Sequence, residues 1–333
     1  MEPQMENPAG SGSAREWIRR GAAMLAVVAL SAGLGSAGMV KAGAPPPDDP
    51  DCEARLEAAV QAISTHPRVK GIPRDKLKAT AEFTTGNMLF VLLHEAAHGL
   101  ISDLGLPVLG REEDAADAFA TVAMLDMKTE FTHRTLVNAA KSWMISDLRD
   151  RDNHEDVVYY DVHGLDLQRA YNIICLMVGS NPDRFEDLAR EVNLPEDRRE
   201  SCRFDYSNAS WSWDKALKPY LRGENQERTK YEIIYGKAEG SLDIFEQALR
   251  VTEIVERVGD RLADIYAWKK PFAIEVKMCG DSSAQWSVIE HKVILCYELA
   301  DEFVQLYKQY GEKPLTALSP RAGSRSSAPL GYR

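Results

Sequence analysis

Apolar positions recur at helical spacing along most of the chain. In residues 52–63 they fall on one face of a helix. Residues 83–104 contain a continuous apolar run, 88–93, which is too long for one strand and therefore predicts a buried helix. Gly105 and Pro107 follow this segment and are typical helix stop signals. Further helices are predicted over residues 111–126, 132–148, 168–178, 183–192, 242–268 and 298–310.

Three short segments have the composition of β-strands instead. Residues 232–235, 273–278 and 292–296 are rich in β-branched residues, and the last two alternate between apolar and polar positions. Many helical segments with few strands predict a mainly helical α+β domain with a small antiparallel sheet. We expect this domain to span residues 52–315.

The first 42 residues have the pattern of a secretory signal peptide. Three basic residues, Arg15, Arg19 and Arg20, precede an uncharged stretch over residues 21–40, and small residues follow its apolar core. About twenty apolar residues can also span a bilayer, so a membrane anchor formed by residues 21–40 is the alternative. Both interpretations predict an exported protein, which is periplasmic or secreted in the first case and membrane-anchored in the second.

Two further segments lie outside the predicted domain. Residues 43–51 contain three consecutive prolines and predict an extended linker. Residues 316–333 are rich in Ser, Pro and Gly and predict a disordered tail.

Composition excludes several classes of protein. Hydrophobic residues make up 44% of the chain and charged residues 27%, which is typical of a globular protein and excludes overall disorder. Lys and Arg total 40 against 51 for Asp and Glu, a net charge of −11. Binding to nucleic acid requires clustered Lys and Arg, so no nucleic-acid partner is expected. A membrane is an expected partner only if the N-terminal segment is not cleaved.

Residues 94–98 read H-E-A-A-H, an H-E-x-x-H motif inside the predicted helix 83–104. Residues four apart lie on one helix face, so His94 and His98 can both bind one Zn²⁺ ion. Glu95 then lies beside the metal, where its carboxylate can take a proton from a zinc-bound water. The alternative is a buried histidine pair without a metal, which would cost free energy for want of polar partners.

A catalytic zinc needs a third protein ligand, and the acidic cluster at residues 112–117 offers one. The cluster opens the next predicted helix, which a short turn brings back antiparallel towards the histidine pair. Glu113 and Asp117 are four residues apart and share a face. Glu113 can therefore bind the metal while Asp117 accepts the N–H of a ligand histidine. Glu112 and Asp114 are alternatives to Glu113 as the ligand.

Both motifs lie in longer segments that resemble a known family. The DUF4344 family of putative metallopeptidases is similar to this chain in residues 90–100, 106–117, 161–169, 179–182 and 296–299. The resemblance extends over residues 80–310 and implies a zincin-like metallopeptidase domain with one zinc ion and a peptide or protein substrate. The chain departs from the family pattern at Ala97 and at residues 283–286, and neither departure touches a predicted ligand.

Two residues of the segment 161–169 are further candidates. His163 could stabilise the oxyanion of a tetrahedral intermediate, as a second catalytic residue beside Glu95. The alternative is a loop histidine that only contacts the following helix. Arg169 could bind a substrate carboxylate.

Four of the five cysteines suggest disulfides. Cys279 and Cys296 lie on successive predicted strands, and Cys175 and Cys202 close a loop. Export makes their oxidation reasonable, and each bridge would stabilise the fold by about 3 kcal/mol. Four cysteines allow three different pairings, and the sequence alone leaves the choice open.

The sequence thus predicts an exported zinc-dependent hydrolase, a metallopeptidase that cleaves peptide bonds with a zinc-bound water activated by Glu95. One alternative is a non-catalytic zinc-binding envelope protein with a peptidase fold, because a fold does not prove an activity. Another is an envelope interaction module in which the histidine pair is structural.

Overall fold

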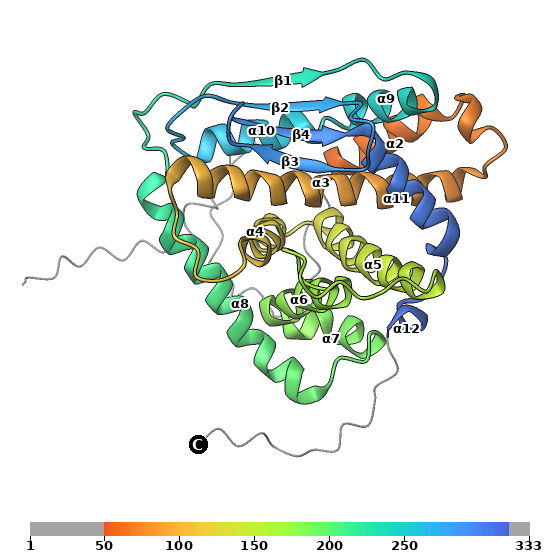
Figure 1. Ribbon diagram of the computed structural model, residues 1–333, viewed down its shortest axis with the longest axis horizontal. Coiled ribbons are helices and arrows are strands. Elements are labelled where there is room, and N and C mark those ends of the chain that lie inside the picture. Colours follow the sequence, from red (N-terminus) through yellow and green to blue (C-terminus); the bar gives the residue numbers. More distant parts are fainter. Residues whose placement is uncertain (1–49, 320–333) are drawn as a thin grey trace, which may run out of the picture.

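A long helix, α3 (Arg74–Leu104), organises the fold (Figure 1). The computed structural model describes residues 50–319. A small sheet covers one side of α3, and a layer of helices covers the other side. This arrangement confirms the prediction of a mainly helical α+β domain. The helical layer contains α4 (Glu112–Met127), α5 (Glu130–Asp152), α6 (Asp166–Ser180), α7 (Pro182–Glu191) and α8 (Glu196–Leu217).

The burial of α3 follows from its sequence. Twenty of its 31 residues are buried, as expected for a helix that is apolar on all sides and covered on both faces. α3 begins directly after Pro73, nine residues before the predicted start, because residues 74–82 are mostly polar and carry no dense apolar pattern. It ends where Gly105 adopts a left-handed backbone conformation, with φ of 70°.

The sheet is mixed rather than antiparallel. Its strand order is β1–β2–β4–β3, in which β1 pairs with β2 and β2 with β4 in parallel, and β3 pairs with β4 antiparallel. The predicted antiparallel arrangement is therefore wrong for β1–β2 and for β2–β4. A helical crossover joins β1 to β2 and permits their parallel pairing. The strands are β1 (Tyr231–Tyr235), β2 (Phe272–Lys277), β3 (Ala284–Ser287) and β4 (Lys292–Cys296).

Three elements between residues 196 and 287 differ from the prediction. The helix expected over 242–268 is divided into α9 (Asp243–Thr252) and α10 (Ile254–Ile265), because Glu253 adopts a left-handed conformation with φ of 52°. α8 was not predicted, since only Cys202 and Leu217 are buried among its 22 residues and no apolar stripe marks it. β3 was also not predicted, because its four residues include a single large apolar side chain, Trp286.

The ends of the described chain are helical. They are formed by α2 (Pro50–Ile63), α11 (Tyr297–Tyr310) and α12 (Leu315–Leu318). The predicted tail therefore begins too early, because Leu315 and Leu318 are three residues apart on one buried face of α12. Likewise, Pro50 and Asp51 belong to α2 and not to the linker. The predicted signal peptide or anchor, residues 43–49 of the linker and residues 320–333 of the tail lie outside the described residues.

Each of the two layers contains one disulfide. One joins Cys175 on α6 to Cys202 on α8, and the other joins Cys279 to Cys296. Cys296 ends β4 opposite Lys277 of β2, so the second bridge closes the carboxyl ends of two parallel strands. Both bridges join the cysteines that the sequence suggested as pairs but could not assign uniquely. Cys52 takes part in neither bridge.

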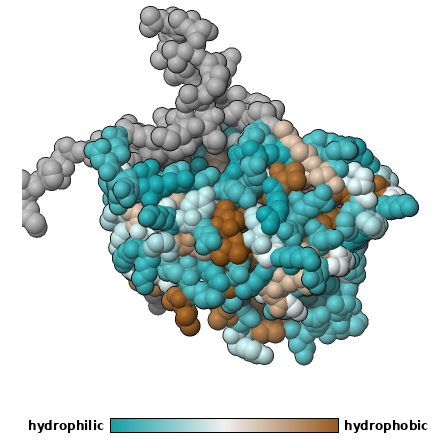
Figure 2. All heavy atoms as spheres, turned by 90° about the horizontal axis from the view of Figure 1, so that it is seen from above, coloured by the Kyte–Doolittle hydropathy of each residue, from teal (hydrophilic) through white to brown (hydrophobic). Residues whose placement is uncertain are grey.

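The surface on the side of the sheet is mostly hydrophilic, and apolar side chains form separate patches on it (Figure 2). Among residues 50–319, no helix combines the length and the apolar character needed to cross a bilayer.

Candidate metal centre

Three side chains from α3 and α4 converge on one point. The Nε2 atoms of His94 and His98 lie 3.1 Å apart, and Oε2 of Glu113 lies 3.0 Å from the first and 3.4 Å from the second. His94 and His98 come from successive turns of α3, and Glu113 comes from the first turn of α4. The connection over residues 105–111 is short, so α4 returns beside α3 as the sequence predicted.

The size of this triangle fits a metal ion. A tetrahedral zinc with ligand bonds of about 2.0–2.1 Å holds its ligand atoms about 3.3 Å from one another. The three atoms therefore have the spacing of one face of such a tetrahedron. Two imidazoles and one carboxylate are a donor set that suits zinc, and the fourth direction is left for a water or a substrate.

The ring of His94 is held from both sides. Its Nδ1 lies 2.8 Å from Oδ1 of Asp117 and its Nε2 faces Glu113. Burial alone would lower the pKa of His94, but the hydrogen bonds with Asp117 and Glu113 outweigh it and raise the pKa to about 9. A hydrogen bond from Nδ1–H to Asp117 fixes the ring so that Nε2 points towards the triangle.

Glu112 gives His98 an equivalent partner. Its Oε1 lies 2.7 Å from Nδ1 of His98, so both histidines of the motif have a carboxylate behind them. The sequence suggested Glu112 and Asp114 only as alternative ligands, and neither belongs to the group of atoms around Glu113. The signal that could have assigned Glu112 is its place next to Glu113 in the first turn of α4, which faces the same pair of histidines.

Arg169 has a partner other than the one expected. Its Nε and Nη2 each donate a hydrogen bond of 2.8 Å to Asp117, and its guanidinium stacks 3.7 Å from the ring centre of Trp143. The side chain is buried, and Asp117 already accepts hydrogen bonds from two of its guanidinium nitrogens. Arg169 is therefore not placed to bind a substrate carboxylate. The structure instead joins Arg169, Asp117 and His94 in one chain of contacts. Neither Arg169 nor Trp143 was recognised in this role from the sequence.

His163 contacts the same carboxylate from the loop before α6. Its Nε2 lies 3.0 Å from Oε2 of Glu113, and its Nδ1 lies 3.0 Å from Oδ1 of Asp161. The hydrogen bond with Glu113 raises the pKa of His163 above its usual value. His163 does not belong to the group of three ligand atoms that all lie within 4.8 Å of one another. It is therefore next to the candidate metal centre without completing it.

Glu95 is buried on the same helix as the two histidines. Burial raises the pKa of its carboxyl above the usual value, while the nearby imidazoles and the backbone N–H of Trp286 lower it in part. The contact with Trp286 places Glu95 between α3 and the edge strand β3. A buried carboxylate with a raised pKa has the property that a general base needs near neutral pH.

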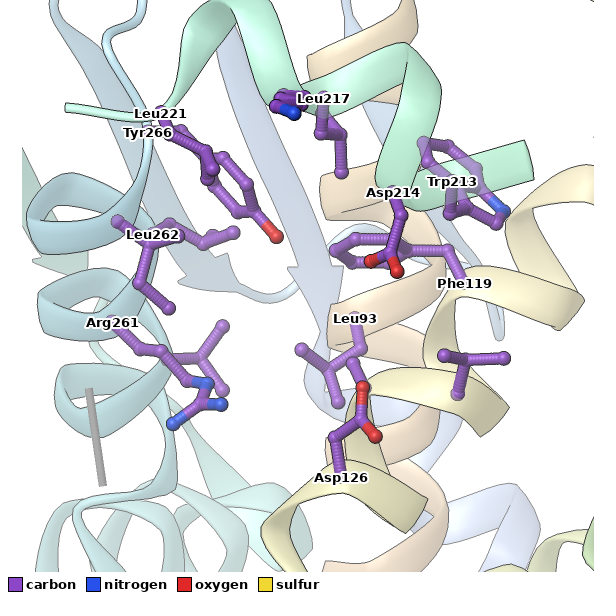
Figure 3. A pocket seen from close by; sticks show the side chains of 15 residues that line it. Leu93, Phe119, Asp126, Trp213, Asp214, Leu217, Leu221, Arg261, Leu262 and Tyr266 are labelled. Carbon is purple, nitrogen blue, oxygen red and sulfur yellow. The ribbon is translucent and has the colours of Figure 1, made fainter. Parts of the chain in front are cut away.

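A separate cavity lies between α4, α8 and α10 and is partly open to solvent. Its walls are mainly apolar, and Figure 3 shows Arg261 and Asp126 extending from facing walls. Burial lowers the pKa of Arg261 below its usual value. Leu93 lines this cavity and precedes His94 directly, but the three converging side chains do not line it.

The second cluster of possible metal ligands among the described residues consists of Cys279, Cys296 and Glu298. Its two sulfur atoms are joined in a disulfide. Glu298 accepts hydrogen bonds from the backbone N–H groups of Cys279 and Gly280. The disulfide and these hydrogen bonds explain why the three side chains lie close together without a metal ion.

A helical α+β domain with two histidines and a glutamate around one point, and a second glutamate beside them, has the features of a metallopeptidase. The comparison with known families agrees. Residues 55–217 match DUF4344, described as "Putative metallopeptidase", and this segment of the chain belongs to that family. No curated protein and no solved structure matches the chain.

The family match includes every residue of the candidate centre and ends at the last residue of α8. It begins earlier than the resemblance seen in the sequence and ends well before residue 310, so the expected likeness at 296–299 lies outside it. Membership in a family with this description implies a metal cofactor and a peptide or protein substrate.

Proposed function

We propose that the protein is an exported zinc-dependent peptidase whose metal is held by His94, His98 and Glu113. The observation that carries this proposal is the triangle of two Nε2 atoms and one carboxylate oxygen, with sides of 3.0 to 3.4 Å. Its edges fit the ligand spacing of zinc, and its open side leaves a position for the reacting groups.

The residues around the triangle orient it. Asp117 and Glu112 accept the Nδ1–H groups of the two histidines, so that each ring offers Nε2 to the metal. Arg169 fixes Asp117 by two hydrogen bonds. When bound, a zinc ion would supply a Lewis acid that polarises the peptide carbonyl and lowers the pKa of water.

Glu95 acts as the general base and then as the general acid. Its carboxylate takes a proton from the attacking water and afterwards delivers it to the nitrogen of the leaving amine. Its burial keeps the carboxylate poorly solvated and raises its pKa, so both steps are accessible near neutral pH. The N–H of Trp286 holds this carboxylate in place.

His163 would stabilise negative charge that develops on the carbonyl oxygen. Its Nε2–H now faces Glu113 and becomes available as a donor when that carboxylate binds the metal. Its imidazole lies at the edge of the centre, with a raised pKa that keeps a proton on the ring. A donor positioned before the reaction favours the tetrahedral state over the planar peptide. Asp161 accepts from both the backbone N–H and the ring of His163 and so holds it.

A peptide substrate is supported by the edge of the sheet. β3 pairs with β4 alone among the described strands, so its other edge carries backbone groups that an extended peptide can pair with. β3 lies beside α3, and the backbone N–H of its residue Trp286 bonds to Glu95. The two disulfides support export to an oxidising compartment.

The test combines metal content with the variant Glu95→Gln. We expect the full chain to carry one zinc ion after gentle purification and to cleave unfolded casein, and we expect Glu95→Gln to retain the zinc and lose the cleavage. Purified protein without stoichiometric zinc would sink the proposal. Bound zinc without cleavage by the unaltered chain would favour a non-catalytic zinc-binding protein.

A further inference from the structure

Residues 153–165, which join α5 to α6, expose an unusual run of apolar side chains. Five of the six residues from 157 to 162 are large and apolar, and they are between 43% and 91% exposed. They are Val157, Val158, Tyr159, Tyr160 and Val162. None of the five packs against the core formed by the described residues. Single exposed apolar side chains are common, but a contiguous group of this kind marks a binding surface.

The run is anchored at both ends. At its start, the N–H of Asn153 bonds to Arg149 and the N–H of Glu155 bonds to Asp150, so the loop continues directly from α5. At its end, His163 contacts Glu113, and Arg111 reaches the carbonyl of His163. The end of the run is therefore tied to the candidate metal centre through His163, while its apolar side chains remain exposed.

The distance to the centre is short. Tyr160 is three residues from His163, so their Cα atoms can be at most about 11 Å apart, and a tyrosine side chain spans much of that length. His163 in turn lies 3.0 Å from Oε2 of Glu113. A peptide whose scissile bond lies at the centre has its neighbouring side chains within reach of this run.

We propose that residues 157–162 form the part of the substrate site that receives large apolar side chains next to the scissile bond. This inference rests on the proposed peptidase function and adds its substrate class, namely peptides with large aliphatic or aromatic residues beside the cleaved bond. Tyrosines provide large contact areas at low entropic cost, since each has only two side-chain torsions.

Charge and size favour a substrate over other partners. Glu155, Asp156 and Asp161 flank or interrupt the run, and an anionic membrane attracts Lys and Arg instead. A stable interface with a second copy of the chain typically needs about 800 Å² and 20–30 residues on each side, more than this run of six can provide. A short peptide segment has the matching size.

The experiment compares two probe peptides with the full-length protein. Both are quenched fluorescent peptides of one sequence, with either Leu-Phe or Ser-Ser at the positions flanking the scissile bond. The unaltered protein should have a higher kcat/KM for the Leu-Phe peptide, and the double variant Tyr159→Ser/Tyr160→Ser should reduce the ratio of the two values about tenfold or more. Both side chains are exposed, so the variant should keep the Tm and the zinc content of the parent.

Phe204→Ser is the matched control. Phe204 is 73% exposed on α8, a helix that contributes no side chain to the triangle. This variant removes a comparable exposed apolar side chain and should leave the ratio unchanged. An equal fall of the ratio in Phe204→Ser, or no fall in the double variant, overturns the inference.

A binding measurement separates this inference from the proposed function. Peptides of the same two sequences, with the fluorophore but without the quencher, are titrated with Glu95→Gln and followed by fluorescence anisotropy, with and without the two tyrosine changes. If the unaltered protein cleaves neither peptide, the peptidase function fails, while tighter binding of the Leu-Phe peptide that is lost in the double variant still supports the apolar site. Equal binding of both peptides overturns it. So does a double variant that loses only binding to phosphatidylglycerol vesicles or self-association in sedimentation.

Discussion

At the scale of single residues, the candidate centre depends on a buried chain of polar contacts. Arg169 donates two hydrogen bonds to Asp117, and Asp117 accepts from His94, whose other nitrogen faces the metal position. Burial would raise the pKa of Asp117, but Arg169 and His94 together hold it below its usual value. The carboxylate therefore stays ionised and keeps its acceptor for the histidine ring.

Removing the guanidinium should weaken zinc binding. In Arg169→Met the buried Asp117 loses its cation, its pKa rises, and a protonated carboxyl orients His94 less well. We expect a 10- to 100-fold loss in zinc affinity, measured by competition with a chromophoric chelator. Arg169→Lys keeps the positive charge but cannot form both hydrogen bonds to Asp117 in the same geometry. Its zinc affinity should therefore lie between those of the unaltered protein and Arg169→Met. Unchanged affinity in Arg169→Met would show that the contact with Asp117 does not support the metal.

His133 lies outside the candidate metal centre and makes the free energy of unfolding depend on pH. Its Nδ1 accepts a hydrogen bond of 2.9 Å from Nε of Arg184, so protonation would break this bond and place two cations side by side. Burial and the charge of Arg184 lower the pKa of His133 to about 4, against a usual value near 6.5. Between pH 4 and pH 6.5, His133 is therefore mostly protonated in the unfolded chain and mostly neutral in the folded chain.

The stability that neutral His133 provides should be lost as the pH falls from 6.5 to 4. We expect a loss on the order of 2 kcal/mol in the free energy of unfolding, measured with urea. His133→Asn keeps an acceptor for Arg184 but does not titrate, so its stability should fall less over the same range. Parallel pH curves for the two proteins would contradict this assignment.

At the scale of elements, the sequence predicted the helices that carry dense apolar patterns and the positions of the centre on them. The motif on α3 and the acidic first turn of α4 were both recognised, because residues four apart share a helix face. α8 and β3 were not recognised, since α8 has no apolar stripe and β3 is a short edge strand. Their formation depends on tertiary contacts that no local pattern shows.

The partners of His98 and Arg169 were missed for a related reason. Spacing along a helix identifies which side chains share a face, but not which of several neighbouring carboxylates meets which ring. The rotation of α4 relative to α3 decides which histidine each of Glu112, Glu113 and Asp117 contacts. Likewise, Arg169 approaches Asp117 from α6, 52 residues further along the chain.

The close approach of α6 and α8 predicts a stability effect. A Cβ atom at Gly179 would lie 2.0 Å from the carbonyl oxygen of Cys202, so Gly179→Ala forces the two helices apart beside their disulfide. We expect a loss of about 3 kcal/mol in the free energy of unfolding. Gly223→Ala is the control, because nothing lies within 4 Å of its Cβ position, and it should change stability by about 0.5 kcal/mol or less. Equal effects in the two variants would mean that the helices can separate freely.

At the scale of the whole molecule, α3 connects the two layers that build the site. The helical layer supplies Glu113 and His163, and the sheet supplies the N–H of Trp286 beside Glu95. Each layer carries one disulfide, which fixes it separately. A metal bound between α3 and α4 would therefore tie together parts of the molecule that are already rigid, as a precise catalytic geometry requires.

The location of zinc tests this account most directly. Crystals of the zinc-loaded, full-length protein, measured at the zinc absorption edge, should show one anomalous peak per chain, about 2.0–2.2 Å from Nε2 of His94, Nε2 of His98 and a carboxylate oxygen of Glu113. The absence of a peak between these three side chains would contradict the account, as would a single peak at Cys279, Cys296 and Glu298.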